Sequence, residues 1–165
     1  MKTIGKAIDL LTNITKNIAL LLMALMMVFI SFAVISRAMF TPIVGDVELV
    51  QLGMVVLIMC GLAYTEQVDG HIAIGLIVDR FPDKIQKIFS AIANFLTAVV
   101  TLVIGFIYFE VAMNHKNHMQ LSSSLLDIPY YPIDFIIVIG FALWGLQALF
   151  KMVTPIIALF EAKQE

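Results

Sequence analysis

The sequence has little charge and very little cysteine. Of its 165 residues, 13% are Asp, Glu, Lys or Arg, and 61% are hydrophobic. A soluble domain is closer to about half apolar and a quarter charged, so the excess apolar surface must face lipid. The composition therefore predicts a polytopic membrane protein. The net charge of −2 does not indicate a partner, because the placement of charges matters more than their sum in such proteins.

Other absences exclude several classes of protein. The single cysteine, Cys60, cannot form an internal disulfide, and without a CxxC pair the chain is not a four-helix thiol oxidoreductase. We interpret Cys60 as a small packed residue. The sequence contains no nucleophile–base arrangement, no glycine-rich phosphate loop and no basic patch for nucleic acid, so we predict no cofactor and no catalytic residue.

Four long apolar runs predict an all-α membrane protein with four transmembrane helices in a single domain, 1–165. The expected spans are 18–40, 47–67, 85–111 and 132–151. Residues 1–17 alternate polar and apolar faces with a helical period, which predicts an amphipathic N-terminal helix on the membrane surface. The segment 71–81 is too short to span and is expected at the interface. Apolar character continues past Ala33, so we do not expect signal-peptide cleavage.

The basic residues predict the topology, because cytoplasmic segments are enriched in lysine and arginine. With the N-terminus inside, two basic residues lie outside, Arg37 and Lys116, and eight lie inside: Lys2, Lys6, Lys16, Arg80, Lys84, Lys87, Lys151 and Lys163. We therefore expect both termini on the cytoplasmic side of a bacterial inner membrane.

Ionisable residues are expected at the ends of the spans rather than inside them. Arg37 ends the first span, Asp46 and Glu48 begin the second, Glu66 ends it, and Glu110 closes the third. A proton-coupled exporter needs a carboxylate within a span, and a haem-carrying bundle needs histidines there. The pattern therefore argues against both classes. Arg37 and Glu48 lie at the same outer face, where they either form an ion pair between the first two helices or act as two separate interfacial anchors.

Two further patterns each allow a structural and a functional interpretation. His115 and His118 have the spacing of a metal pair, but without a convincing third ligand a solvated loop within 112–132 is favoured, and we predict no metal. Small and polar residues form a stripe on the third span: Ser90, Asn94, Thr97, Thr101 and Gly105. Such a stripe marks a packing side or a substrate path, and the absence of an ionisable group favours packing.

The order of motifs resembles the small membrane subunit of tripartite ATP-independent periplasmic (TRAP) transporters, the DctQ-like family. The resemblance is carried by Ser36-Arg37, Asp46-Val47-Glu48-Leu49, Gly61-Leu-Ala, Gly70-His71-Ile72 and Phe81-Pro82. It implies a non-catalytic scaffold subunit. Its partners would be a large DctM-like membrane subunit, which carries the substrate and ion sites, and a DctP-like periplasmic binding protein.

The resemblance also implies uptake of an organic anion, such as a dicarboxylate, sialic acid or another acidic sugar, by symport with an ion that is usually sodium. Arg37, Glu48, Gly70 and His71 are the positions that match the family, and we assign them structural or subunit-contact roles. The alternative is a self-sufficient homo-oligomeric channel or small exporter, assembled through the third-span stripe. A membrane enzyme built on Glu66 and His71 has no motif behind it.

Overall fold

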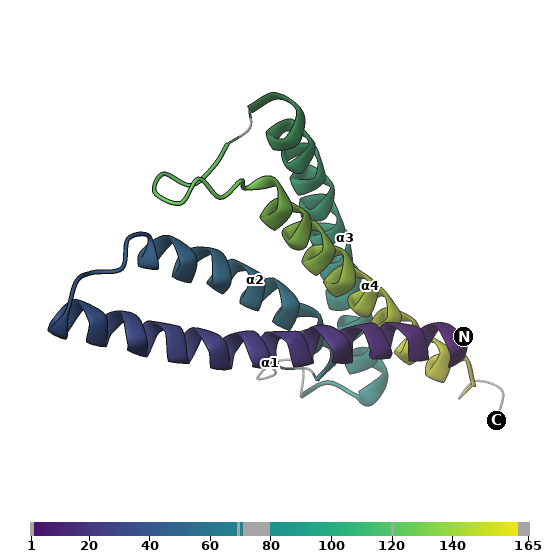
Figure 1. Ribbon diagram of the computed structural model, residues 1–165. Coiled ribbons are helices and arrows are strands. Elements are labelled where there is room, and N and C mark those ends of the chain that lie inside the picture. Colours follow the sequence, from purple (N-terminus) through teal and green to yellow (C-terminus); the bar gives the residue numbers. More distant parts are fainter. Residues whose placement is uncertain (1, 69, 71–79, 120, 162–165) are drawn as a thin grey trace.

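Helices make up nearly all of the part of the chain that the computed structural model describes, which is residues 2–68, 70, 80–119 and 121–161. They are α1 (Lys2–Met39), α2 (Asp46–Gln67), α3 (Asp83–Asn114), the short π-helix η2 (His115–Met119) and α4 (Tyr131–Glu161) (Figure 1). The four α-helices are each long and apolar enough to cross a membrane, and these described segments contain no β-strand. The predicted all-α membrane fold with four long helices is confirmed.

The first helix is one continuous element. α1 comprises 38 residues, which makes it about 57 Å long at 1.5 Å per residue. The hydrocarbon core of a bilayer is only about 30 Å thick. The amphipathic helix and the first span that we expected as neighbours are therefore joined without a break near Asn17, and the apolar candidate span already begins at Ile8.

The second helix begins where Gly45 turns the chain. Gly45 has a φ of 80°, in the left-handed region that glycine adopts without a Cβ clash. A Cβ at this position would also lie only 2.6 Å from Cγ of Leu126. Asp46 and Glu48 follow in the first turn of α2, where the helix dipole favours negative charge.

The third helix is longer than we predicted. We expected Glu110 to close it, but α3 continues to Asn114 and η2 follows directly as far as Met119. No proline or glycine interrupts the sequence between Glu110 and Met119, so nothing in the local chemistry ends the helix there. The first part of the expected loop, up to Met119, is instead a helical extension.

Two helical hairpins pack against each other. α1 pairs with α2, α3 pairs with α4, and α2 packs on α4 between the hairpins. In Figure 1 the hairpins converge near the N-terminal end of α1 and diverge toward the α1–α2 and α3–α4 connections. Where they converge, Gly5 lies against Phe150, whose Cζ is 2.5 Å from the position that a Cβ on Gly5 would take.

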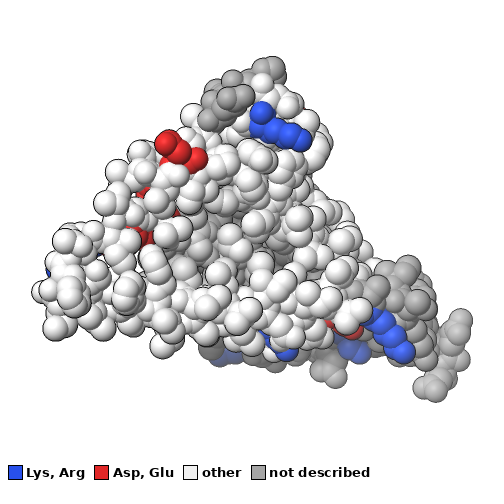
Figure 2. All heavy atoms as spheres, in the orientation of Figure 1, with Lys and Arg blue, Asp and Glu red and all other residues white. Residues whose placement is uncertain are grey.

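The interior contains small and polar side chains, and the large apolar ones face outward. The buried hydrophobic residues of the described chain are all alanines: Ala33, Ala63, Ala98, Ala112 and Ala148. Met27, Val28 and Phe32 are 68%, 70% and 61% exposed, and the face in Figure 2 has a broad uncharged middle. Lipid is as apolar as a protein core, so large side chains need not be buried and small ones bring the helices together.

Glycines make two of the helix contacts close. A Cβ on Gly140 of α4 would lie 2.8 Å from Cβ and 3.0 Å from the carbonyl oxygen of Met59 on α2. On α2, a Cβ on Gly53 would lie 2.6 Å from Sδ of Met26. Gly61, eight residues after Gly53, makes no such contact: among the described residues no atom comes within 4 Å of its Cβ position. Eight residues at about 100° each turn Gly61 about 80° away from Gly53.

Candidate functional site

An ion pair joins the end of α1 to the start of α2. Nη2 of Arg37 donates to Oδ2 of Asp46 over 2.7 Å. The other carboxylate oxygen, Oδ1, accepts the backbone N–H of Val47 at 2.8 Å. Asp46 is 8% exposed, so its charge is held where Arg37 and the first turn of α2 both stabilise it.

Glu48 binds a different part of the chain. Its Oε1 accepts the N–H of Leu125 at 3.0 Å, and its Oε2 accepts the N–H of Leu126 at 3.1 Å. Of the two alternatives for Arg37 and Glu48, the structure favours separate contacts over a mutual ion pair, because Asp46 is the partner of Arg37. Two residues turn a helix by about 200°, so Asp46 and Glu48 point to opposite sides of α2.

Glu48 binds the connection between α3 and α4, which is closed by its own backbone hydrogen bonds and is not an open loop. The N–H of Ser123 donates to the carbonyl of Ile128 at 2.9 Å, and the N–H of Tyr130 donates to the carbonyl of Leu121 at 3.0 Å. Glu48 thus ties the α3–α4 connection to the start of α2. Together with the Arg37–Asp46 pair, this contact holds the two helical hairpins, α1–α2 and α3–α4, at the end where Figure 1 shows them diverging.

His115 also has a structural partner. Its Nδ1 lies 2.7 Å from Oδ2 of Asp134 in the first turn of α4. The solvated-loop interpretation is wrong for His115, whose side chain is only 20% exposed. Asp134 was not among the predicted residues, although a carboxylate directly after Ile133, the first residue of an apolar run, was a visible signal. The side chain of His118 lies outside the described residues.

At the other end of α2, polar contacts join it to α4. Oε2 of Glu66 accepts the indole N–H of Trp144 at 3.0 Å, and Nζ of Lys151 donates to the backbone carbonyl of Glu66. Glu66 is 7% exposed, so a charged group is held between helices next to two donors. Trp144 was a further residue that we did not assign, because its partner is 78 residues away in the sequence.

The same end of α2 also contacts α1. Nε2 of Gln67 donates to Oδ1 of Asp9 at 2.8 Å. Nζ of Lys16 lies 4.9 Å from the centre of the Tyr64 ring, within the range of a cation–π contact. Two polar residues of the amphipathic segment, Asp9 and Lys16, therefore face protein, and α2 is held by α1 and α4 together.

One end of the stripe of small and polar residues on α3 packs within the chain, and the other end is more exposed. Thr101 is 2% exposed, and its hydroxyl donates to the carbonyls of Thr97 and Ala98. A Cβ on Gly105 would lie 3.4 Å from Cβ of Phe141 on α4. Ser90, at the other end of the stripe, is exposed, and Asn94 is half-buried. The half of the stripe that contains Thr101 and Gly105 therefore packs within the chain.

The two remaining predicted positions follow α2. The N–H of Gly70 donates to the carbonyl of Thr65 at 2.8 Å, which continues the hydrogen bonding at the end of α2. His71 and most of the expected interfacial segment, residues 71–79, lie outside the described residues.

The Arg37–Asp46 contact predicts that Arg37 is energetically coupled to Asp46 but not to Glu48. In double-mutant cycles, Arg37→Gln and Asp46→Asn should be coupled by about 0.5–1 kcal/mol, because Arg37 is 59% exposed and solvent weakens the pair. Arg37→Gln and Glu48→Gln should be additive. The measurement is the free energy of unfolding in detergent. Equal coupling of Arg37 to both carboxylates would contradict the geometry.

The fold and these junctions define a multi-pass membrane protein whose buried carboxylates join its own helices. Residues 18–157 match the family described as tripartite ATP-independent periplasmic transporters, DctQ component. The chain belongs to this family, and it is therefore a small membrane component of a TRAP transporter. A search of curated proteins found no match.

Proposed function

We propose that this chain is the non-catalytic scaffold subunit of a TRAP transporter that takes up an organic anion with an ion gradient, most commonly of sodium. The observation that carries the proposal is the use of the buried carboxylates. Asp46 binds Arg37, Glu66 binds Trp144, and Asp134 binds His115. Each contact joins two helical elements, as a scaffold requires.

The partners in this proposal are a large DctM-like membrane subunit and a DctP-like periplasmic binding protein. The outward-facing apolar side chains of α1, such as Met27 and Val28, support a role beside lipid or another membrane subunit. Ser90, which is exposed, and Asn94, which is half-buried, are the proposed polar contacts. The excess of basic residues on one side supports cytoplasmic termini in a bacterial inner membrane.

Reconstitution tests the proposal. Liposomes that contain this chain alone should accumulate no labelled dicarboxylate or sialic acid under an inward sodium gradient. Liposomes with the large subunit and external binding protein, but without this chain, should take up much less of the system's substrate. Adding the chain should restore this uptake. A mild-detergent pull-down should recover a polytopic partner several times larger.

Two outcomes would overturn the scaffold role. Uptake or conductance by the chain alone would establish the channel or exporter instead. Undiminished uptake by the other two components in its absence would show that the chain is dispensable.

A further inference from the structure

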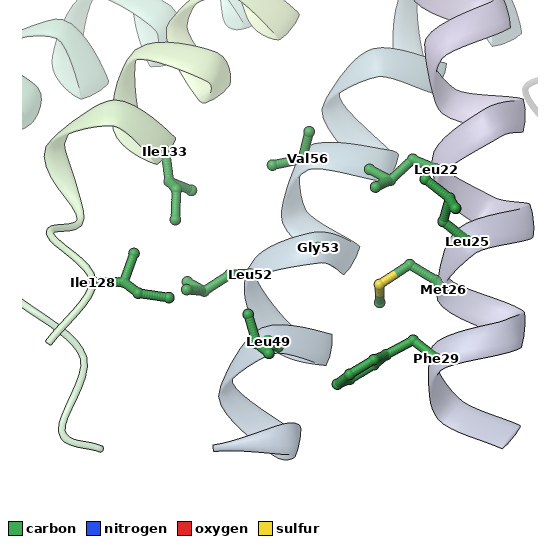
Figure 3. A pocket seen from close by; sticks show the side chains of 10 residues that line it. All are labelled: Leu22, Leu25, Met26, Phe29, Leu49, Leu52, Gly53, Val56, Ile128 and Ile133. Atoms are coloured by element: carbon green, nitrogen blue, oxygen red, sulfur yellow. The ribbon is translucent and has the colours of Figure 1, made fainter. Parts of the chain in front are cut away.

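An apolar pocket of about 380 Å³ lies between α1, α2 and the start of α4. Leu25 and Phe29 line it from α1, Leu49 and Leu52 from α2, and Ile133 from α4 (Figure 3). Its volume falls within the range of about 300–1,000 Å³ that is typical of ligand pockets. Every residue that lines it is apolar, so its ligand must present hydrocarbon.

The position of the pocket places it inside the bilayer. Its α1 and α2 residues lie within the candidate spans Ile8–Met39 and Asp46–Gln67. They belong to the outer half of each helix, where Figure 1 shows the hairpins diverging. If the pocket were empty, the side chains that line it would lose dispersion contacts. Lipid tails are the hydrocarbon that surrounds the protein in the bilayer and can fill the pocket.

The volume distinguishes a lipid chain from an inserted helix. A helix with its side chains is about 10–12 Å across and rises 5.4 Å per turn, so even one turn takes up on the order of the whole pocket. One flexible acyl chain therefore matches this space better than a transmembrane helix of a partner does.

A cation lies beyond the pocket along α1. Arg37 is eleven residues after the pocket residue Met26, which places it about 20° from Met26 around the helix, and about 12 Å beyond Phe29 along the axis. It lies about 60–120° around the helix from the other three α1 residues that line the pocket. Its side chain is 59% exposed, and Asp46 is bound through Nη2. A guanidinium has five N–H donors and matches phosphate geometry.

We propose that this pocket binds one acyl chain of a membrane phospholipid, with the lipid phosphate at Arg37. The bound lipid completes the packing between the diverging hairpins. This inference rests on the membrane fold and not on the proposed transport role, so either can fail without the other.

The test uses the full chain in its purified complex, loaded with phosphatidylethanolamine carrying a diazirine on one acyl chain. Leu25→Trp fills the pocket, and Leu21→Trp is the matched control. The two leucines are one turn apart on α1 and 58% and 63% exposed, but only Leu25 lines the pocket. Both variants must co-elute with the partner subunits.

We expect photo-labelling of the Leu22–Phe29 and Leu49–Val56 peptides, and phospholipid retained in native mass spectra. Leu25→Trp should reduce both about tenfold, equivalent to about 1.4 kcal/mol of binding, and Leu21→Trp should leave both unchanged. Arg37→Gln should reduce labelling by the phospholipid but not by a diacylglycerol with the same diazirine chain. Equal retention in the two tryptophan variants, or cross-links from a partner helix into the pocket, would overturn the proposal.

Discussion

Glu66→Ala should lower the free energy of unfolding by about 1–3 kcal/mol, because it removes a partly buried hydrogen bond whose acceptor is a carboxylate. The indole N–H of Trp144 is bonded to Oε2 of Glu66 at 3.0 Å. Glu66→Gln retains an acceptor oxygen and should cost less. The chain has a single tryptophan, so Trp144 fluorescence follows this junction directly during unfolding in detergent.

A matched glutamate provides the control for this prediction. Glu110 is exposed on α3, and Glu110→Ala should change the free energy of unfolding by no more than about 0.5 kcal/mol. If Glu66→Ala and Glu110→Ala behave alike, the contact between Glu66 and Trp144 does not stabilise the fold.

Gly140→Ala and Gly61→Ala should change stability in opposite directions. At Gly140 the new methyl would lie 2.8 Å from Cβ and 3.0 Å from the carbonyl oxygen of Met59, so α2 and α4 must separate. We expect a loss of about 1–3 kcal/mol, as for other overpacked sites. At Gly61, with no described atom within 4 Å, alanine should stabilise the helix by about 0.5–1 kcal/mol.

Thermal unfolding in detergent measures both glycine variants. Pull-down of the partner subunits adds a second measurement, because a shifted α2–α4 contact should also weaken assembly. An equal effect of alanine at the two positions would show that the close approach of Met59 to Gly140 does not hold the hairpins together.

The side chains whose partners differ from the sequence predictions share a physical cause. Arg37 and Glu48 were correctly placed at neighbouring helix ends, but the direction in which each side chain points depends on its angle around the helix. That angle made Asp46 the partner of Arg37 and turned Glu48 toward Leu125 and Leu126. The partner of His115 was missed because Asp134 lies across a connection whose path the sequence does not specify.

The sequence by itself determined the membrane class, the four long helices and the family. Each follows from local properties: hydrophobicity summed over about 20 residues predicts a span, and short motifs in a fixed order carry the family resemblance. Such signals survive without knowledge of any contact between distant residues.

Only the tertiary structure decided which helix faces meet. The Glu66–Trp144 bond, the contact of Gly140 with Met59 and the apolar pocket beside Phe29 all join residues far apart in the chain. In a membrane the helices are apolar on every side, so hydrophobic periodicity does not mark the buried face. Close fit of small residues and a few polar bonds select that face, and both depend on the relative rotation of whole helices.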